Sequence, residues 1–219
     1  MLRKRVIPCL QLLDNALVKT VKFKKPAYIG DPINTVRIFN ELEVDELCFL
    51  DIRATLEDRD PNWDILEQIT NECFMPLSYG GGIKSLDTAK RLFQMGFEKV
   101  VLNSAAFSNP ELITEITTVY GNQAVVGSID IKKDLFGRSK VYVQDGTKSI
   151  GSSPIEWAQK LESAGVGELL ITSMDKEGTW HGFDISLISS IADAVDVPVV
   201  ALGGAGGVDD INDVFANTN

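Results

Sequence analysis

The sequence predicts an α/β protein, a (β/α)8 TIM barrel made of two repeated half-barrels. Apolar, strand-like runs alternate with stretches of helical periodicity along all 219 residues, which is the pattern of a parallel sheet with crossover helices. Seven strand–helix units follow one another, and positions in the first half match positions 122 residues further on. A half of four units, duplicated once, is the plan of this barrel.

The elements are expected in strict alternation, each strand a short apolar run and each helix a longer stretch with apolar residues three or four apart. The strands are expected at 6–11, 47–52, 77–79, 100–102, 125–131, 169–173 and 197–202. The helices are expected at 33–42, 63–73, 85–95, 111–119, 155–164, 185–194 and 208–216. The connection 132–151 is long and carries two turn signals, so a hairpin that includes Tyr142-Val143 is expected there.

The internal repeat defines the domain. Pro32-Ile33 recurs as Pro154-Ile155, and Gly81-Gly82 recurs as Gly203-Gly204, both at an offset of 122 residues. We therefore expect a single domain over 1–219, with half-barrels at about 1–122 and 123–219. Residue 219 corresponds to residue 97, just before the fourth strand, so the eighth unit is expected to be missing from this chain. A doubly wound open sheet is the alternative, but it gives no reason for the halves to correspond.

The composition excludes several classes of protein. Acidic side chains outnumber basic ones by 31 to 21, so we expect no nucleic-acid partner and expect phosphate to be held by local groups. The sequence has no apolar run long enough for a membrane span and no signal cleavage site, so we expect a cytoplasmic chain without membrane contact. Three cysteines and one histidine fit neither a disulfide framework nor a metal site. We expect no metal and no cofactor.

Two glycine-rich turns follow the third and seventh expected strands and open the next helices: Gly80-Gly81-Gly82 and Gly203-Gly204-Ala205-Gly206. Glycine lets the backbone approach an anion closely, and the N–H groups at the start of a helix attract it. We predict a phosphate site at each turn, suited to a ligand with a phosphate at either end. Tight βα turns without a ligand are the alternative. Asn103-Ser104 and Thr179, after the fourth and sixth strands, add side-chain donors.

Carboxylates at strand ends are candidates for proton transfer, because the active site of such a barrel lies at the carboxyl ends of its strands. Asp130 ends the fifth strand between two isoleucines, where it is well placed as a general acid or base. If these apolar flanks lie close to it in space, desolvation would raise its pKa. A structural hydrogen-bond acceptor is the alternative. Asp51 and Asp175 are further acidic candidates, and Lys19, in the loop after the first strand, is a candidate cation.

Motifs spread over the whole chain resemble HisF, the cyclase subunit of imidazole glycerol phosphate synthase. They are Arg5-Val6-Ile7-Pro8-Cys9-Leu10, Val18-Lys19, Gly30-Asp31-Pro32, Phe49-Leu50-Asp51-Ile52, Gly80-Gly81-Gly82-Ile83, Asn103-Ser104-Ala105-Ala106, Ile129-Asp130, Thr172-Ser173-Met174-Asp175 and Gly203-Gly204-Ala205-Gly206. The resemblance implies a barrel that binds a bisphosphorylated aminoimidazole-carboxamide ribonucleotide. It also implies that ammonia arrives from a HisH-like glutaminase partner in a heterodimer, and that the products are imidazole glycerol phosphate and the aminoimidazole-carboxamide ribotide.

The resemblance also implies roles for individual residues. The family uses two catalytic aspartates, of which the second matches Asp130 and the first is replaced by Gln11. An amide cannot exchange a proton near pH 7, so one acid–base role is vacant. Two further departures are Leu202 at a phosphate-contacting serine position and Glu177 where aspartate is usual. The expected catalytic residues are Asp130, Gln11 and Lys19, and the expected phosphate- and substrate-binding residues are Asp51, Gly81, Gly82, Asn103, Ser104, Asp175, Glu177, Gly178, Thr179, Gly203, Gly204 and Gly206.

An ammonia entrance is implied at the other end of the barrel. Four charged residues match the ring that gates the base of the cyclase barrel, each just before a strand: Arg5, Glu46, Lys99 and Glu168. Structural salt bridges are the alternative for this set. Glu98 and Gln123 lie where the family meets its glutaminase, so a docking surface is expected there.

Four functions remain open from the sequence. The first is a lyase that closes an imidazole ring, with Asp130 as acid–base catalyst and Gln11 only orienting substrate. The second is an ammonia-delivering homologue, because several stretches look closer to a divergent branch of the family linked to acetamidino modification of nucleotide sugars in lipopolysaccharide and other surface-polysaccharide biosynthesis. The third is a non-catalytic binding module for phosphorylated ligands. The fourth is a related isomerase, against which Gln11 counts.

Overall fold

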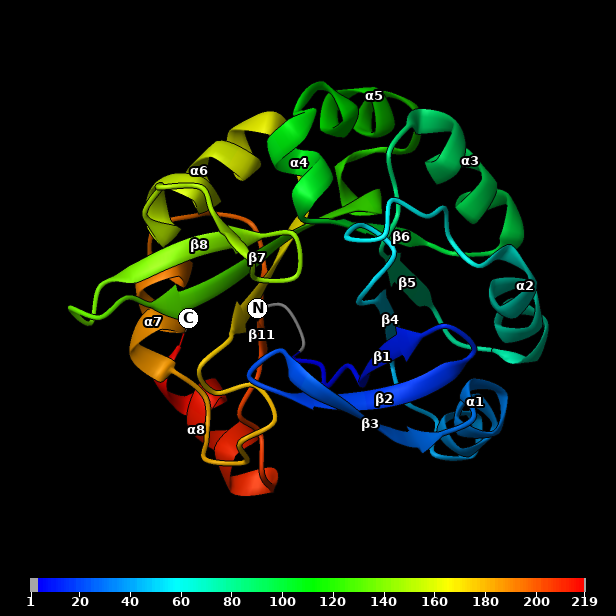
Figure 1. The fold of residues 1–219 in the computed structure, drawn as a ribbon, viewed down its shortest axis with the longest axis horizontal. Helices are drawn as coiled ribbons and strands as arrows, with labels where there is room; N and C mark the ends of the chain where they lie inside the picture. Colours follow the sequence, from blue (N-terminus) through cyan, green and yellow to red (C-terminus); the bar gives the residue numbers. More distant parts are fainter. Residues whose placement is uncertain (1–3, 219) are drawn as a thin grey trace. The chain divides into compact units, whose positions relative to one another are not determined.

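Figure 1 shows a computed structural model of the protein, in which residues 4–218 are described. These residues form two compact units. The first unit comprises the chain up to Lys19 together with Pro26–Val101, and the second comprises Thr20–Lys25 together with the chain from Leu102 onward. Both units are built from parallel strands that alternate with helices, so the protein has the α/β fold that the sequence predicts.

The first unit is built around four parallel strands in the order β1–β4–β5–β6. The antiparallel strand β2 lies on the other side of β1, and β3 follows as its neighbour. The helices α1, α2 and α3 lie along one side of these strands (Figure 1). The elements are β1 (Cys9–Leu13), β2 (Ala16–Val21), β3 (Lys24–Gly30), α1 (Pro32–Glu41), β4 (Leu47–Asp51), α2 (Trp63–Glu72), β5 (Leu77–Gly80), α3 (Leu86–Met95) and β6 (Lys99–Leu102).

Local signals explain where these helices start and end. Asp31 caps α1 by accepting a hydrogen bond from the backbone N–H of Asn34 at 2.8 Å, and Pro32 occupies the first helical position, where its missing N–H has no cost. Ser85 caps α3 in the same way, and Gly96 ends it in a left-handed conformation. The apolar faces of α2 and α3 are buried, which anchors both helices to the unit's core.

The second unit has a core of three parallel strands in the order β7–β10–β11, with β8 antiparallel to β7 and β9 antiparallel to β8. The β8–β9 hairpin confirms the hairpin expected within 132–151. The elements are α4 (Ser104–Ser108), α5 (Glu111–Tyr120), the 3-10 helix η1 (Asn122–Ala124), β7 (Val125–Lys133), β8 (Ser139–Val143), β9 (Lys148–Ser149), α6 (Pro154–Ala164), β10 (Glu168–Ser173), α7 (Ile185–Ala192), β11 (Val199–Leu202) and α8 (Val208–Asn217).

The expected strands and helices are all present, with shifted ends. The first strand begins at Cys9 rather than at Val6, whose side chain is exposed. The placement of Lys19 in a loop was wrong, because Lys19 lies within β2 of a β2–β3 hairpin. This hairpin escaped prediction because β3 is exposed almost throughout and contains Pro26, so it shows none of the apolar alternation of a half-buried strand. The short helix α4 was also missed.

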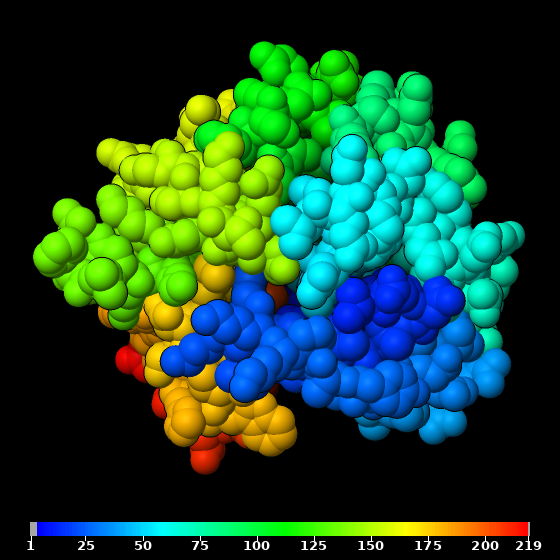
Figure 2. Space-filling model, viewed as in Figure 1, coloured from blue at the N-terminus to red at the C-terminus, as the bar shows by residue number. Residues whose placement is uncertain are grey.

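Loops at the carboxyl ends of the first unit's strands lie together on its surface. Figure 2 shows the dark blue β1–β2 turn beside the cyan loop that follows β4. Asn62 joins the two by donating a hydrogen bond from Nδ2 to Asn15 Oδ1 at 2.7 Å. Within residues 4–218, no helix combines the length and the apolarity needed to cross a membrane. Among the cysteines, Cys48 is buried and Cys9 and Cys73 are partly exposed.

Candidate functional site

Asp130 lies among polar groups of the second unit. It lies on β7, where its neighbours across the sheet are Thr172 of β10 and Tyr142 of β8. Asn103, the residue before α4, donates from Nδ2 to Asp130 Oδ2 at 3.1 Å and to the carbonyl of Ser128 at 3.2 Å. Two residues that the sequence named separately, Asn103 and Asp130, are therefore in direct contact.

The surroundings of Asp130 suit it to proton transfer. The pKa of Asp130 is raised to about 7, chiefly by burial and also by the negative charge of Asp145, against hydrogen bonds from Thr172 and Asn103 that lower it. The side chain keeps partial exposure to solvent. A carboxyl group with a pKa near neutrality can both accept and release a proton under physiological conditions. The sequence predicted this upward shift and its cause, and both are confirmed.

Ser104 connects the same region to the β8–β9 hairpin. Its hydroxyl oxygen accepts a hydrogen bond from the backbone N–H of Gln144 at 2.9 Å and donates to Asn103 Oδ1 at 3.3 Å. The amide of Asn103 is thus held on both of its polar atoms, which fixes the orientation of the group that contacts Asp130.

The loop after β10 contains the four residues predicted for this position: Asp175, Glu177, Gly178 and Thr179. The carboxylate of Asp175 accepts from the backbone N–H of Lys133 at 2.8 Å, and the hydroxyl of Thr179 donates to the carbonyl of Lys176 at 2.7 Å. Glu177 is buried and accepts hydrogen bonds from Thr20 and Phe23. In this structure these three side chains hold backbone segments and a neighbouring hydroxyl in place.

The turn after β11 needs glycine because of its backbone conformation. Gly203 and Gly204 have φ values of 93° and 113°, which disfavour other residues. The N–H groups of Gly206 and Gly207 at the start of α8 donate to Asp210 Oδ2 at 2.7 and 3.2 Å. A carboxylate of the chain itself therefore occupies the position where an anion is expected, and a phosphate that used these N–H groups would have to displace it.

The glycine turn after β5 packs against the loop after β4. A Cβ on Gly81 would lie 2.6 Å from the carbonyl oxygen of Asp51, and one on Gly82 would lie 2.7 Å from that of Arg59. The N–H of Gly82 donates to Thr55 Oγ1 at 3.4 Å. These contacts explain why glycine is needed here without a ligand, and phosphate binding at this turn stays a prediction.

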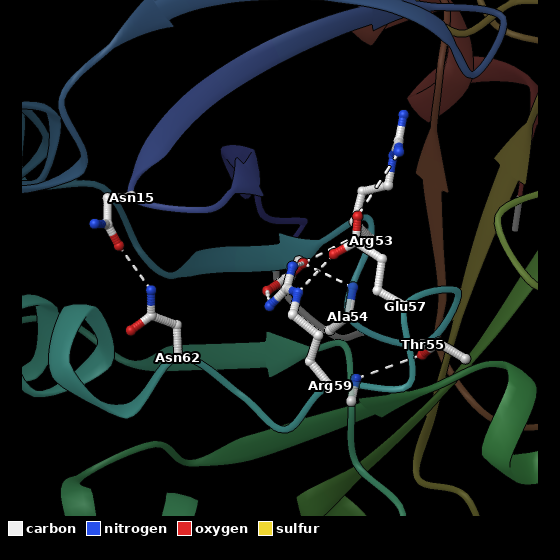
Figure 3. A network of polar contacts seen from close by, with 9 residues as sticks. Asn15, Arg53, Ala54, Thr55, Glu57, Arg59 and Asn62 are labelled. Atoms are coloured by element: carbon white, nitrogen blue, oxygen red, sulfur yellow. Dashed lines mark hydrogen bonds and ion pairs between the residues drawn. The ribbon is translucent and has the colours of Figure 1, made fainter.

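Asp51 belongs to a dense polar network, which Figure 3 shows from close by. Its carboxylate receives two hydrogen bonds from the guanidinium of Arg59, at 3.0 and 3.1 Å, and two from the backbone N–H groups of Arg53 and Ala54, at 3.1 and 3.0 Å. Glu57 contacts Arg59 from the other side, at 2.7 Å. Sequence reasoning missed Arg59, because nothing in an irregular loop indicates which cation will reach a carboxylate eight residues earlier.

The other two predicted catalytic residues belong to the first unit. Gln11 lies on β1 between Val18 of β2 and Leu50 of β4, and it is partly buried. Lys19 lies on β2 and is also partly buried. Their roles toward a substrate stay predictions.

Three of the four predicted gate residues meet at the amino-terminal ends of the first unit's strands. Glu46, which precedes β4, is buried, and its carboxylate contacts Arg5 Nη1 at 2.9 Å and Lys99 Nζ at 3.0 Å. Glu168 opens β10 in the second unit and is buried as well. Glu98 and Gln123 are both exposed, just before β6 and β7. Gln123 donates to the carbonyl of Tyr120 at 2.8 Å.

Comparison with known proteins identifies the family of the chain. The chain belongs to the histidine biosynthesis protein family, whose sequence model matches residues 5–219. Within that family it is HisF-like. It is 52% identical over 218 residues to a Pseudomonas aeruginosa protein provisionally named imidazole glycerol phosphate synthase subunit hisF2, a match that spans 100% of this chain and 87% of the relative.

Two further relatives carry the HisF name without a number. The imidazole glycerol phosphate synthase subunit HisF of Limosilactobacillus fermentum is 44% identical, with 100% of this chain and 84% of the relative covered. The subunit of the same name from Streptococcus sanguinis is 40% identical, with 100% and 86% covered.

Proposed function

We propose that this chain is a cyclase-type subunit that uses ammonia to convert a bisphosphorylated aminoimidazole-carboxamide ribonucleotide into imidazole glycerol phosphate, a step of histidine biosynthesis. The observation that carries the proposal is Asp130, a partly buried carboxyl group whose pKa of about 7 suits a general acid and base. Similarity to subunits named imidazole glycerol phosphate synthase HisF supports the reaction class.

In this proposal each predicted site residue has a defined task. Asn103 holds one carboxyl oxygen through its Nδ2 group, which orients the carboxyl toward a bound substrate. The amide of Gln11 does not ionise near pH 7 and serves as a hydrogen-bonding group, and Lys19 supplies a positive charge. The glycine turns after β5 and β11 hold the two phosphates, the second after displacement of the Asp210 carboxylate.

The proposal extends to the source of ammonia. We infer that a HisH-like glutaminase docks at the amino-terminal ends of the strands, on the side of Glu98 and Gln123, and that ammonia enters past the charged residues there. The contacts of Glu46 with Arg5 and Lys99 support this role, because they bring one carboxylate and two cations together at the amino-terminal ends of the strands. The alternative to an ammonia entrance is that these residues form buried structural ion pairs. The location of the protein in the cytoplasm stays a separate prediction.

Gln11 favours a second candidate. The family's first catalytic aspartate is replaced by an amide, which removes one acid–base group and typically costs about 10²–10⁴-fold in rate. The relatives named hisF2 and hisF3 bear numbers given to additional copies of a subunit. The second candidate is therefore a cyclase-inactive subunit that delivers ammonia to an enzyme that modifies nucleotide sugars.

One pair of assays separates the two candidates. Purified protein is mixed with the bisphosphorylated ribonucleotide and a high concentration of ammonium at alkaline pH, and the loss of substrate absorbance is followed. Turnover supports the cyclase, whereas binding without turnover supports the second candidate. Gln11→Asp is the companion variant. The cyclase proposal predicts a change of less than about tenfold, and a gain of about 10²–10⁴-fold would show that wild-type Gln11 leaves ring closure disabled.

A further inference from the structure

The turn between β2 and β3 is held by one residue from a loop far along the chain. Thr20 Oγ1 donates to Glu177 Oε2 at 3.0 Å, and the backbone N–H of Phe23 donates to the same oxygen at 3.3 Å. The backbone N–H of Lys22 donates to the carbonyl of Glu177 at 2.9 Å. Glu177 is only 1% exposed. Its carboxylate therefore contacts this turn directly and is closed off from solvent.

The turn itself is a strained one. Lys22 and Phe23 alone connect the two strands, and their φ values are 53° and 60°. A two-residue connection of this kind needs positive φ at both positions and normally uses Asn-Gly, because the Cβ of other residues crowds the backbone there. Such a conformation persists only where surrounding contacts hold it. The three hydrogen bonds to Glu177 are contacts of that kind.

The turn is also seated between two other loops of the second unit. A Cβ on Gly178 would collide with the carbonyl oxygen of Thr20, so the chain after Glu177 lies directly against β2. On the other side, a Cβ on Gly146 would lie 3.2 Å from Phe23 Cδ2. The ring of Phe23 therefore lies against the turn that follows β8.

The turn at Gly146 is connected to Asp130 through its neighbour Asp145 and through β8. Gly146 follows Asp145, whose negative charge acts on Asp130. The strand that ends at this turn, β8, pairs with β7 at Tyr142 and Asp130. A change in the position of the Lys22-Phe23 turn would thus alter the packing of the segment that carries Asp145.

We propose that Glu177 is a positioning residue, which holds the Lys22-Phe23 turn closed against Gly146 and so keeps the charge of Asp145 within reach of Asp130. This assignment replaces the substrate contact expected for Glu177, and it rests on the proposed function only for its consequence at Asp130. The length of the side chain is central to it. An aspartate, one methylene shorter, cannot bring its oxygen to both Thr20 and Phe23 while the backbone contact with Lys22 is kept.

Amide hydrogen exchange tests the closed turn without any substrate, so its result is separate from that of the proposed function. Exchange at residues 20–25 is compared in wild type, Glu177→Asp and Glu177→Gln, with Glu115→Gln on the exposed face of α5 as the matched control. Glu177→Asp is expected to speed exchange of the Phe23 amide about tenfold or more. Glu177→Gln, whose amide oxygen can accept the same bonds, is expected to stay within about threefold of wild type.

A double variant tests the strain. Asparagine tolerates the left-handed conformation, so Lys22→Asn is expected to restore about half of the exchange protection lost in Glu177→Asp. If Glu177→Asp does not fold, Thr20→Val removes one of the three bonds and is expected to speed exchange at 20–25 about threefold. Unchanged exchange in Glu177→Asp or Thr20→Val would overturn the proposal, and so would equal acceleration across the whole chain, which would mark a general loss of stability.

The consequence for catalysis is read from kinetic constants. In a cyclase assay with ammonium, Glu177→Gln is expected to keep kcat and KM within about threefold of wild type, whereas Glu177→Asp is expected to lower kcat about tenfold or more with a smaller change in KM. Equal loss of kcat in both variants would contradict a positioning role, because only Glu177→Asp shortens the side chain, whereas Glu177→Gln keeps its length and removes its charge.

Discussion

Arg59 grips both carboxylate oxygens of Asp51, with Nη2 at 3.0 Å from Oδ1 and Nη1 at 3.1 Å from Oδ2. Asp51 is 7% exposed, so its charge is largely removed from water. A buried carboxylate is stable only with partners, and a paired guanidinium matches its geometry better than any other cation. These contacts hold the loop after β4 in place. A structural role in this loop is therefore the alternative to the substrate contact predicted for Asp51.

The first prediction concerns the stability that this pair provides. Arg59→Ala leaves a buried charge without its main partner and is expected to lower the free energy of unfolding by about 3 kcal/mol in urea titrations. Arg53→Ala is the matched control, because its side-chain ion pair with Glu57 spans 3.8 Å between groups that are 42% and 40% exposed. It is expected to cost less than about 1 kcal/mol. Equal costs for the two variants would show that the Asp51 contacts contribute little.

The second prediction concerns Asp130 and pH. Its pKa in the folded protein, about 7, lies above the ordinary value of 3.8. The folded state therefore binds a proton more tightly than the unfolded state, and the contribution of Asp130 to stability falls as pH rises from about 4 to 7. Asp130→Asn removes this dependence. Relative to wild type, the variant is expected to gain roughly 2–4 kcal/mol of unfolding free energy between pH 4 and pH 8.

The same variant is expected to lose activity. Replacement of the acid–base group lowers turnover by about 10²–10⁴-fold in the ammonium-dependent cyclase assay. Ser128→Ala, on the same strand, is the control and is expected to fold and turn over normally, since Asn103 contacts only the backbone carbonyl of Ser128. A constant stability difference from pH 4 to pH 8 would contradict the raised pKa, and an active Asp130→Asn would contradict its catalytic role.

The third prediction concerns Glu46. Glu46→Gln removes the negative charge that contacts Lys99, whose side chain is 16% exposed. We expect a loss of about 2–3 kcal/mol of unfolding free energy. In a complex with a HisH-like glutaminase, we also expect glutamine-dependent turnover to fall while ammonium-dependent turnover is retained. Glu41→Gln, at an exposed position in α1, is the control. Equal loss with both nitrogen sources would argue for structural salt bridges only.

The fourth prediction concerns the start of α8. Asp210 accepts hydrogen bonds from the N–H groups of Gly206 and Gly207, so it competes with any anion for them. Asp210→Asn removes the competing charge and is expected to tighten binding of inorganic phosphate about tenfold, measured by titration calorimetry. Asp213→Asn, later in the same helix, is expected to have no such effect. Weaker binding in Asp210→Asn would show that phosphate does not use these N–H groups.

Much of the fold could be predicted because most strands are buried apolar runs and most helices have an amphipathic face. The β2–β3 hairpin could not, because its turn consists of Lys22 and Phe23 rather than Asn-Gly, and because its stability comes from Glu177 about 150 residues later. A local pattern cannot report a contact of that range. The same holds for α4, a single turn without a periodic pattern.

The candidate site divides in a similar way. Asp130, Asn103 and the four charged residues that the resemblance assigns to a gate each have a regular place at the end or the start of a strand, and their roles in function stay predictions. The roles of Asp51 and Glu177 were harder to predict, because a carboxylate at a strand end looks the same in sequence whether it faces a ligand or a protein donor. Arg59 and Asp145 lie in irregular segments, where position along the chain carries no information about contacts.

The close approach of Gly81 to Asp51 couples the effects of mutations in the glycine turn after β5 to those of mutations in the Asp51–Arg59 ion pair. A side chain at Gly81 would push against the backbone and the Cβ of Asp51 and loosen the grip of Arg59. Mutations at the glycine turn and at the ion pair should therefore be epistatic, and the damage from one should depend on the state of the other. In a laboratory selection for new ligands, the glycine turn after β5 and the loop after β4 would therefore have to acquire compensating substitutions together. Most exposed loops could accumulate substitutions one at a time.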